Sequence, residues 1–524
     1  MSALNKMFRY FLTSLFLVIF YIFLWPSVAI GQSPCSDMEL GKLPILANGR
    51  VKPLTVHSFE TLKAISGKAK RSMATQNFCK LSFFEPLNLS IRVDHVELKE
   101  KLGMDTQQKS ISIDKVLPFE NDLTSEMHQM ITEKNDKTSY GKALNQFLLS
   151  LQTYRLVIDG RSWTIPIATS GPESDWVSLS EFRSEQVVAT PKKTIEAIKK
   201  AGQNYLQKVE STVPLENTYY RLNFISYKVL FSFLALIIVF LVQKRDVRTQ
   251  FWIGGLACGL VLILGAIDLT FRIIISGRGP VTNMYETVLW VGMGITLFAT
   301  LLAFVKRKPV YFLFGLVGMV LTTFMNRFAP AMVDPSIQPL VPVLRDNFWL
   351  STHVTTVTIS YAAFALSWLI ANYYLIKSII KGPQNVDAKE NQDLAYAAIK
   401  IGVVLLAAGI ILGGVWADYS WGRFWGWDPK ETWSLIALLI YVAILHGRYA
   451  GWIKPKQFLP FISLAFLSIL MCWFGVNYIL AAGLHSYGFS ENGTIFLVSI
   501  FSLQIILFVL HYFRNQRPLT KPIS

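Results

Sequence analysis

The sequence predicts a polytopic α-helical membrane protein with about ten transmembrane helices and one exported α+β domain. Hydrophobic residues make up 52% of the 524 residues and charged residues only 16%, which is too apolar for a soluble protein of this length. Stretches long enough to cross a bilayer recur along the chain. They lie at 10–30, 222–242, 251–275, 287–305, 310–328, 353–377, 395–415, 433–449, 458–480 and 495–513.

Basic residues give these predicted helices a sidedness. Lys6 and Arg9 precede the first stretch, and basic segments follow the second, fourth, sixth, eighth and last stretches. The positive-inside rule places these segments in the cytoplasm and the intervening ones on the outer side. The formal net charge of +16 is therefore a topology signal. It does not indicate nucleic-acid binding, because the chain has no basic-aromatic stripe of that kind.

The N-terminal stretch fits either a cleaved signal peptide or a membrane anchor. Residues 1–30 combine a basic start, an apolar run and a small-residue cleavage candidate at Ala29-Ile30-Gly31, as signal peptides do. The apolar run of about 20 residues is also long enough to stay in the membrane, and we prefer the anchor. Both alternatives export residues 31–221.

The exported segment is polar and large enough for its own core. Tyr154–Ile158 and Trp163–Ile167 are β-rich runs around Asp159-Gly160-Arg161, a pattern that predicts a hairpin. Lys192–Val209 is expected to form a helix. These expectations give the segment its α+β class.

The four cysteines fall into two groups. Cys35 and Cys79 lie in the exported segment, where an oxidising compartment allows a disulfide between them. Cys258 and Cys472 lie within apolar stretches and are expected to be packing residues. The absence of CxxC and CxxCH excludes a thioredoxin-type redox pair and a c-type cytochrome.

Five of the 14 tryptophans fall between residues 416 and 433, with a long apolar run on each side. They are Trp416, Trp421, Trp425, Trp427 and Trp433. Large rigid π faces, a few charges and two glycines at a membrane surface suit a flat, mostly apolar ligand such as haem. The alternative is an interfacial aromatic belt, but a belt spreads one or two tryptophans over each helix end.

Three of the seven histidines are candidate ligands. His353 and His485 are both expected on the outer side, like the tryptophan-rich segment, and two imidazoles can bind a haem iron from opposite faces. Each of them taken alone is better explained as a hydrogen-bonded interfacial residue; it is the pair on one side of the membrane that indicates a ligand set. His446 lies about 20 Å along its helix from Trp433, and an ionisable residue within the membrane is a candidate functional residue. His57, His95, His128 and His511 are assigned no role.

The segment from Trp421 to Trp433 resembles the tryptophan-rich WWD motif of haem-handling proteins. Its Trp-Asp-Pro-Lys-Glu-Thr-Trp ending is similar to the CcsA/ResC family of System II cytochrome c biogenesis. The resemblance extends over residues 245–513 and includes Arg272 and the stretch Ser276-Gly-Arg-Gly-Pro-Val-Thr-Asn-Met-Tyr-Glu286.

This resemblance implies a function and its residues. His353 and His485 match the axial haem ligands of the family, and His446 matches a histidine embedded in the membrane. Haem b would cross the membrane and be joined covalently to CxxCH apocytochrome c, the activity of a cytochrome c synthase (haem lyase). Thiol-reduction proteins would be further partners, and the location would be a bacterial cytoplasmic (inner) membrane, with the WWD segment on the periplasmic side.

The front of the chain resembles, more weakly, the end of the partner protein CcsB/ResB. The whole would be a CcsB–CcsA fusion with a shortened front. Residues 10–30 contain no histidine, so His446 lacks the in-chain partner found in the family. A CcsB/ResB-like membrane subunit is expected to supply it, unless the inner haem site is built differently or is absent. The predicted parts are 1–30, the exported ResB-like domain 31–221, the last ResB-like helix and loop 222–250, the CcsA-like domain 251–513 with the WWD loop 416–433, and a cytoplasmic tail 514–524.

Three charged residues of the motif have two possible roles each. Arg423, Asp428 and Lys430 could contact haem propionates or fix the loop, and Asp428 before Pro429 also suits a helix N-cap.

Two alternative functions remain at this point. One is a haem exporter or chaperone of the System I type, which delivers haem to another ligase; the Pro-Lys-Glu-Thr-Trp ending and the CcsB-like front argue against it. The other is a solute transporter, which would be expected to carry more charges within its spans than the few seen here, such as Asp268.

Overall fold

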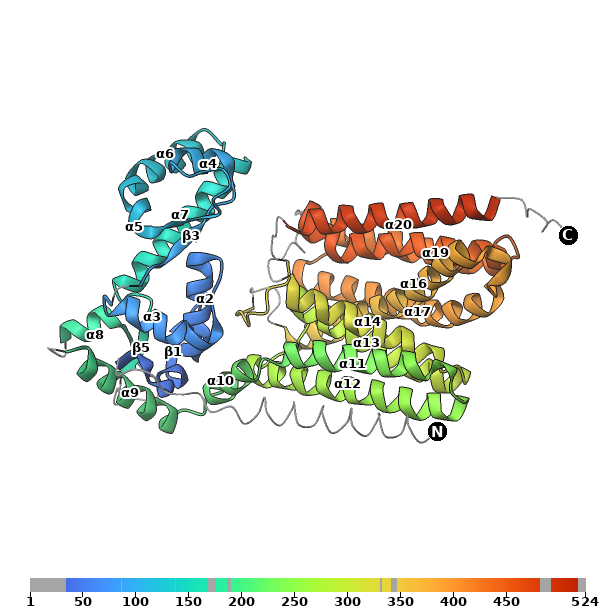
Figure 1. Cartoon of the computed structure of the whole chain (residues 1–524), viewed down its shortest axis with the longest axis horizontal. Helices are drawn as coiled ribbons and strands as arrows, with labels where there is room; N and C mark the ends of the chain where they lie inside the picture. Colours follow the sequence, from blue (N-terminus) through green and yellow to red (C-terminus); the bar gives the residue numbers. More distant parts are fainter. Residues whose placement is uncertain are drawn as a thin grey trace, which may run out of the picture. The chain divides into compact units, whose positions relative to one another are not determined.

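The computed structural model describes residues 34–85, 87–136, 138–167, 175–185, 190–329, 332–340, 346–480 and 492–516. The described chain divides into two compact units (Figure 1). Among the described residues, the first comprises 34–47 together with those between 53 and 210, and the second comprises 48–52 and those from 211 onward. The predicted N-terminal span 10–30 and His485 lie outside the described residues.

The first unit is mainly helical, with short strands that pair two by two. Strands β3 and β4 are antiparallel, as are β5 and β6, and β1 pairs with β2. The predicted α+β composition is confirmed. The elements are η1 Pro34–Ser36, η2 Met38–Lys42, β1 Pro44–Ala47, β2 Arg50–Pro53, α2 Leu54–Ser66, η3 Arg71–Met73, α3 Ala74–Ser82, β3 Ser90–Arg92, α4 Val96–Lys101, β4 Ser110–Ser112, α5 Ile113–Val116, η4 Leu117–Phe119, α6 Glu120–Thr132, α7 Ser139–Ile158, β5 Thr164–Ile167, β6 Asp175–Ser178, α8 Leu179–Glu185 and α9 Pro191–Lys208.

The hairpin predicted around Asp159-Gly160-Arg161 is wrong in its first half. Tyr154–Ile158 is the last part of α7, whereas Thr164–Ile167 is a strand that pairs with β6. Leu144, Phe147 and Leu151 are buried at helical spacing, so the β-rich run continues one face of a longer helix. The predicted helix 192–209 is confirmed by α9.

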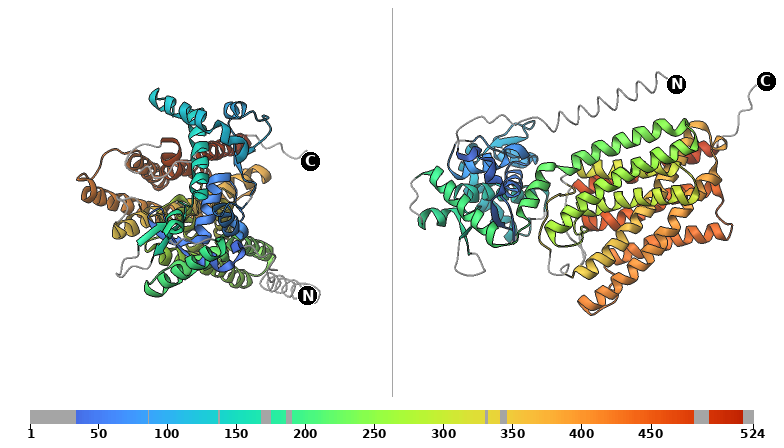
Figure 2. Two further views of the ribbon diagram at one scale, coloured as in Figure 1. Left: turned by 90° about the vertical axis from the view of Figure 1, so that its left-hand side faces the viewer. Right: turned by 90° about the horizontal axis from the view of Figure 1, so that it is seen from below.

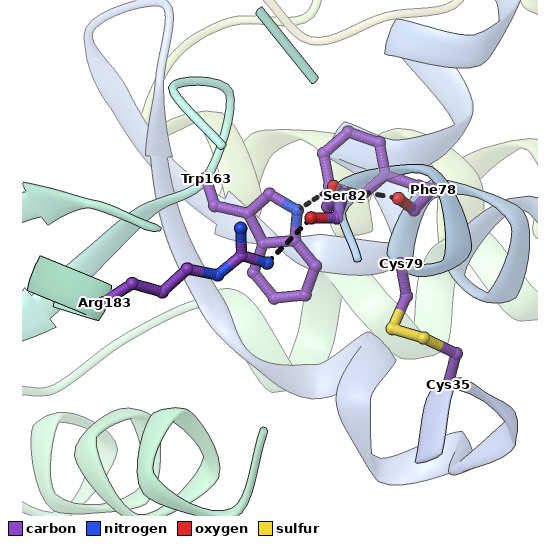
Figure 3. Close-up of a disulfide and its surroundings, with 6 residues drawn as sticks. All are labelled: Cys35, Phe78, Cys79, Ser82, Trp163 and Arg183. Atoms are coloured by element: carbon purple, nitrogen blue, oxygen red, sulfur yellow. Dashed lines mark hydrogen bonds between the residues drawn. A yellow bond between two sulfur atoms is a disulfide. The ribbon is translucent and has the colours of Figure 1, made fainter. Parts of the chain in front are cut away.

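A disulfide joins the start of the first unit to its core. Cys35 and Cys79 are bonded, with Cα atoms 5.5 Å apart and both side chains buried (Figure 3). Beside them, Trp163 Nε1 donates a 2.7 Å hydrogen bond to Ser82 Oγ. Closing a loop of 44 residues is worth about 4 kcal/mol by chain entropy. A buried disulfide of this kind is typical of an oxidising compartment.

The second unit contains nine helical stretches long and apolar enough to cross a membrane among the described residues. They match the predicted spans from 222–242 onward, and so the polytopic helical class is confirmed. The elements are α10 Val213–Leu222, α11 Phe224–Leu241, η5 Val242–Lys244, α12 Val247–Ser276, α13 Met284–Lys306, α14 Val310–Phe328, α15 Asn347–Trp349, η7 Leu350–Val354, α16 Thr355–Lys381, η8 Pro383–Asn385, α17 Ala388–Trp421, α18 Pro429–Tyr449, α19 Pro455–Leu470, η9 Met471–Leu480 and α20 Asn492–Gln516.

These spans lie side by side as a bundle (Figure 1 and Figure 2). Helix α16 is central, because it packs against α13, α14, α17, α19 and α20. Its small residues, such as Ala362, Ala363 and Ala371, are fully buried, as expected where neighbouring membrane helices approach closely. The segments η7 and η9 are π-helical, a backbone form that occurs frequently at functional sites.

Candidate functional site

A pocket opens within the second unit, between α16, α17, η9 and the first turns of α13 and α18. Its lining includes the aromatic side chains of Trp416, Phe424 and Trp425. It also includes the polar side chains of Lys430 and Asn477. Such a cleft, largely apolar with a few polar groups, is the usual form of a small-molecule site.

The tryptophan-rich segment is mostly helical, so the predicted loop 416–433 is too wide. Helix α17 continues to Trp421 and ends at Gly422, whose φ of +67° favours glycine. Helix α18 begins at Pro429, because proline suits the first helical position. Only residues 422–428 form the turn between them.

Charged side chains fix this turn. Asp428 Oδ1 accepts a 2.9 Å hydrogen bond from Lys430 N, so the predicted N-cap role is confirmed. Glu431 Oε2 accepts from Gly426 N at 2.8 Å and from Asp428 N at 3.2 Å. Arg423 Nη1 lies 3.5 Å from Glu431 Oε1. Asp428 and Arg423 therefore stabilise the turn itself, whereas Lys430 is the predicted cation that lines the pocket.

The five tryptophans do not form one platform. Trp416 and Trp425 line the pocket, and the other three are not among its described lining residues. Trp427 is 70% exposed, Trp433 packs on the core of the bundle, and the ring of Trp421 lies 6.0 Å from the guanidinium of Arg423.

His353 lies on η7 and lines the pocket. Its Nδ1 is 2.9 Å from the carbonyl oxygen of Gly409 on α17, and its ring centroid is 5.7 Å from that of Trp416. A carbonyl only accepts, so Nδ1 is the donor in this contact. Histidines that bind metals usually donate their other N–H to such an acceptor.

Gly413 lets this imidazole lie against α17. A Cβ at Gly413 would be 2.5 Å from His353 Cε1 and 3.0 Å from Nδ1. We therefore expect Gly413→Ala to displace the ring and weaken ligand binding roughly fivefold or more, since overpacking costs about 1–3 kcal/mol. The measurement is ligand retained per protein after purification. Gly259→Ala is the matched control, because a Cβ there meets nothing within 4 Å; equal behaviour of the two variants would contradict this role.

His446 is not brought to the pocket. It lies in the last turn of α18, exposed, with its ring edge-on to Trp452 at 5.4 Å.

Residues that the sequence did not single out complete the pocket wall. Cys472 was expected to be a packing residue; it is buried, but it also lines the pocket, with Sγ 3.1 Å from the hydroxyl of Tyr361. Trp473 and Asn477 follow it on η9. Phe424 could have been found, because it lies within the tryptophan-rich motif. The others stand in apolar stretches with no local signal.

The part of the chain that forms the pocket is similar to known proteins. The family model described as Cytochrome C assembly protein matches residues 281–485. CcsA of Prochlorococcus marinus, described as a cytochrome c biogenesis protein, is 35% identical over 258 residues, which are 44% of this chain and 82% of that protein. CcsA of Guillardia theta is 33% identical over 272 residues, 47% of this chain and 88% of that protein.

The chain belongs to the CcsA family of cytochrome c biogenesis proteins.

A longer relative and a solved structure also match. NrfI of Wolinella succinogenes is 35% identical over 273 residues, which are 50% of this chain but only 29% of that protein. The structure of "Cytochrome c Heme Lyase CcmF" overlaps 55% of this chain and 50% of its own, at 18% identity and a TM-score of 0.41. In this CcsA-type chain, every described residue that lines the pocket falls within the family match.

Proposed function

We propose that this CcsA-type chain binds haem in the pocket and attaches it covalently to CxxCH apocytochrome c. His353 carries the proposal. Its imidazole lines the pocket, and its Nδ1 contacts the Gly409 carbonyl oxygen, the kind of contact that the second ring nitrogen of a metal-binding histidine usually makes. In the proposed site His353 and His485 would both hold the haem iron.

The rest of the pocket suits the remaining parts of haem. The rings of Trp416 and Trp425 offer apolar faces to a porphyrin. Lys430 supplies a cation for a propionate carboxylate. Arg423 is engaged by Glu431, so we assign it to the turn rather than to the propionates.

In the attachment step the protein mainly has to orient the cysteine thiols and the haem vinyl groups toward each other. Each cysteine thiol of CxxCH adds across a vinyl group of haem b: the S–H bond and the vinyl π bond break, and one C–S and one C–H bond form. The addition needs no net electron transfer, but the thiols must arrive reduced, so thiol-reduction proteins are proposed partners. The chain's own contribution is to hold the iron at His353 and the porphyrin plane against Trp416.

The proposed topology follows the basic loops. The pocket and residues 31–221 would lie on the periplasmic side of a bacterial inner membrane. The buried Cys35–Cys79 disulfide supports export of the first unit. We keep the proposed division into a ResB-like domain 31–221, a ResB-like helix at 222–250 and a CcsA-like domain 251–513.

The position of His446 supports the proposal that the chain has a partner subunit. Its side chain is exposed on α18, so a ligand bound there would also be open to another chain. A CcsB/ResB-like membrane protein would supply the second ligand of an inner haem site. His446→Ala should then reduce haem delivery while leaving binding in the outer pocket unchanged.

The test is complementation in the source cells. Deletion of the chain should abolish haem-stained c-type cytochromes and leave b-type haem unchanged, and the wild-type chain should restore them. His353→Ala should fail to restore them. If the deletion strain still forms thioether-linked haem on a CxxCH reporter, the chain is needed neither to deliver nor to attach haem, and the proposal is wrong.

A further inference from the structure

Buried ion pairs connect α11, α12 and α13 near the pocket. Lys228 on α11 forms an ion pair with Asp268 on α12, and Tyr219 on α10 donates a 2.7 Å hydrogen bond to the same carboxylate. One turn along α12, Arg272 donates to Glu286 on α13 at 2.7 and 3.1 Å. The four charged side chains are at most 3% exposed.

Glu286 connects these ion pairs to the pocket wall through hydrogen bonds. Its Oε2 accepts hydrogen bonds from Thr282 N at 3.0 Å and from Thr282 Oγ1 at 2.8 Å. Its backbone N–H donates to Asn283 Oδ1 at 2.9 Å. Thr282 and Asn283 both line the pocket, so the Glu286 carboxylate helps to position this part of the wall, together with Arg278, which donates to Thr282 Oγ1.

Arg272 contacts the Glu286 carboxylate directly and is linked to the Asp268 carboxylate through Tyr219. Asp268 and Arg272 stand four residues apart on α12, so their side chains share one helix face. Tyr219 bridges the two, because its hydroxyl donates to Asp268 and accepts from Arg272 Nη1 at 3.4 Å. Lys228 neutralises Asp268 and thereby leaves Arg272 paired with Glu286.

We propose that Lys228, Asp268, Arg272 and Glu286 are positioning residues for the pocket. Helices α10 and α11 precede the family match, which begins at residue 281, yet they belong to the ligand-binding machinery. Loss of Lys228 alone leaves the buried Asp268 carboxylate with the Tyr219 hydrogen bond but without its ion-pair partner, which is costly. Arg272 then pairs with Asp268 instead of Glu286. Residues 281–284 of the pocket wall become more mobile, because Glu286 no longer holds them in place. The identity of the ligand rests on the proposed function.

Two variants of the full-length chain test the network. Lys228→Met should lower haem retained after purification at least fivefold. In haem-free protein it should speed amide hydrogen exchange in residues 279–287 at least tenfold, because Thr282 N loses its acceptor. Lys228→Met/Asp268→Asn removes both charges and leaves Arg272 with Glu286, so it should return both readouts to within twofold of wild type.

The control is Lys308→Met, which breaks an exposed ion pair with Glu390 beyond the far end of α13; both readouts should stay at the wild-type level. Rescue by the double variant separates positioning from a loss of folding, since a fold that needs the buried pair would not recover. Unchanged exchange in Lys228→Met, or a double variant as impaired as the single one, overturns the proposal. If the wild-type chain retains no haem, the proposed function fails, and the exchange data alone decide the network.

Discussion

Replacing His353 by alanine is expected to lower haem affinity by at least about tenfold. Loss of a hydrogen-bond partner of a metal-bound histidine already costs 10–100-fold in metal affinity, so loss of the ligand itself should cost no less. The haem that remains should change from six-coordinate low-spin to a five-coordinate or high-spin spectrum. Exogenous imidazole should partly restore both the amount and the spectrum, because it fills the vacant axial position.

His128→Ala is the control for this variant. His128 is exposed on α6 in the first unit, so its loss should leave haem content and spectrum unchanged. A His353→Ala protein with the wild-type haem level and spectrum would remove His353 from the ligand set, whatever imidazole does.

The tryptophans are expected to separate into two classes. Trp416→Ala and Trp425→Ala should each weaken haem binding by about 2 kcal/mol, roughly 30-fold, because both rings line the pocket and a buried aromatic ring contributes through its area and its stacking. The corresponding Phe variants should stay within about fivefold of wild type, since they keep a ring. Trp427→Ala should change binding less than twofold, because that ring is 70% exposed.

Haem titration of the purified variants measures this difference. Trp252→Ala, at an exposed ring on α12, controls for general effects of removing an indole. Equal losses in Trp425→Ala and Trp427→Ala would mean that the turn as a whole, rather than the pocket wall, contacts haem. Equal losses for Phe and Ala at Trp416 would assign its role to the indole N–H.

The spans could be predicted because their signals are local. An apolar run between basic segments fixes a membrane helix almost by itself, and the predicted 310–328 coincides with α14. The end of α17 could not be fixed in the same way. Tryptophans at 416 and 421 fit a helix or a loop equally well, and the stop at Gly422 shows only in its backbone conformation.

The site was partly predictable, because some of its residues also carry a local signal in the sequence. His353, Trp416 and Lys430 stood out by residue type, and the structure places them around one pocket. Cys472 and Trp473 did not, because the π-helical backbone that brings them there depends on packing against neighbouring helices. In the sequence, Asp268 is only a charge within an apolar stretch. Its partner Lys228 lies 40 residues earlier, a pairing that no local pattern reveals.

The absorption spectrum of the detergent-purified wild-type chain, recorded with and without dithionite, tests the central claim most directly. Two imidazoles on one iron predict a Soret band that shifts on reduction, with sharp α and β bands of six-coordinate low-spin haem. A preparation that stays monodisperse but shows no Soret band, even after incubation with haem, would contradict haem binding in this pocket.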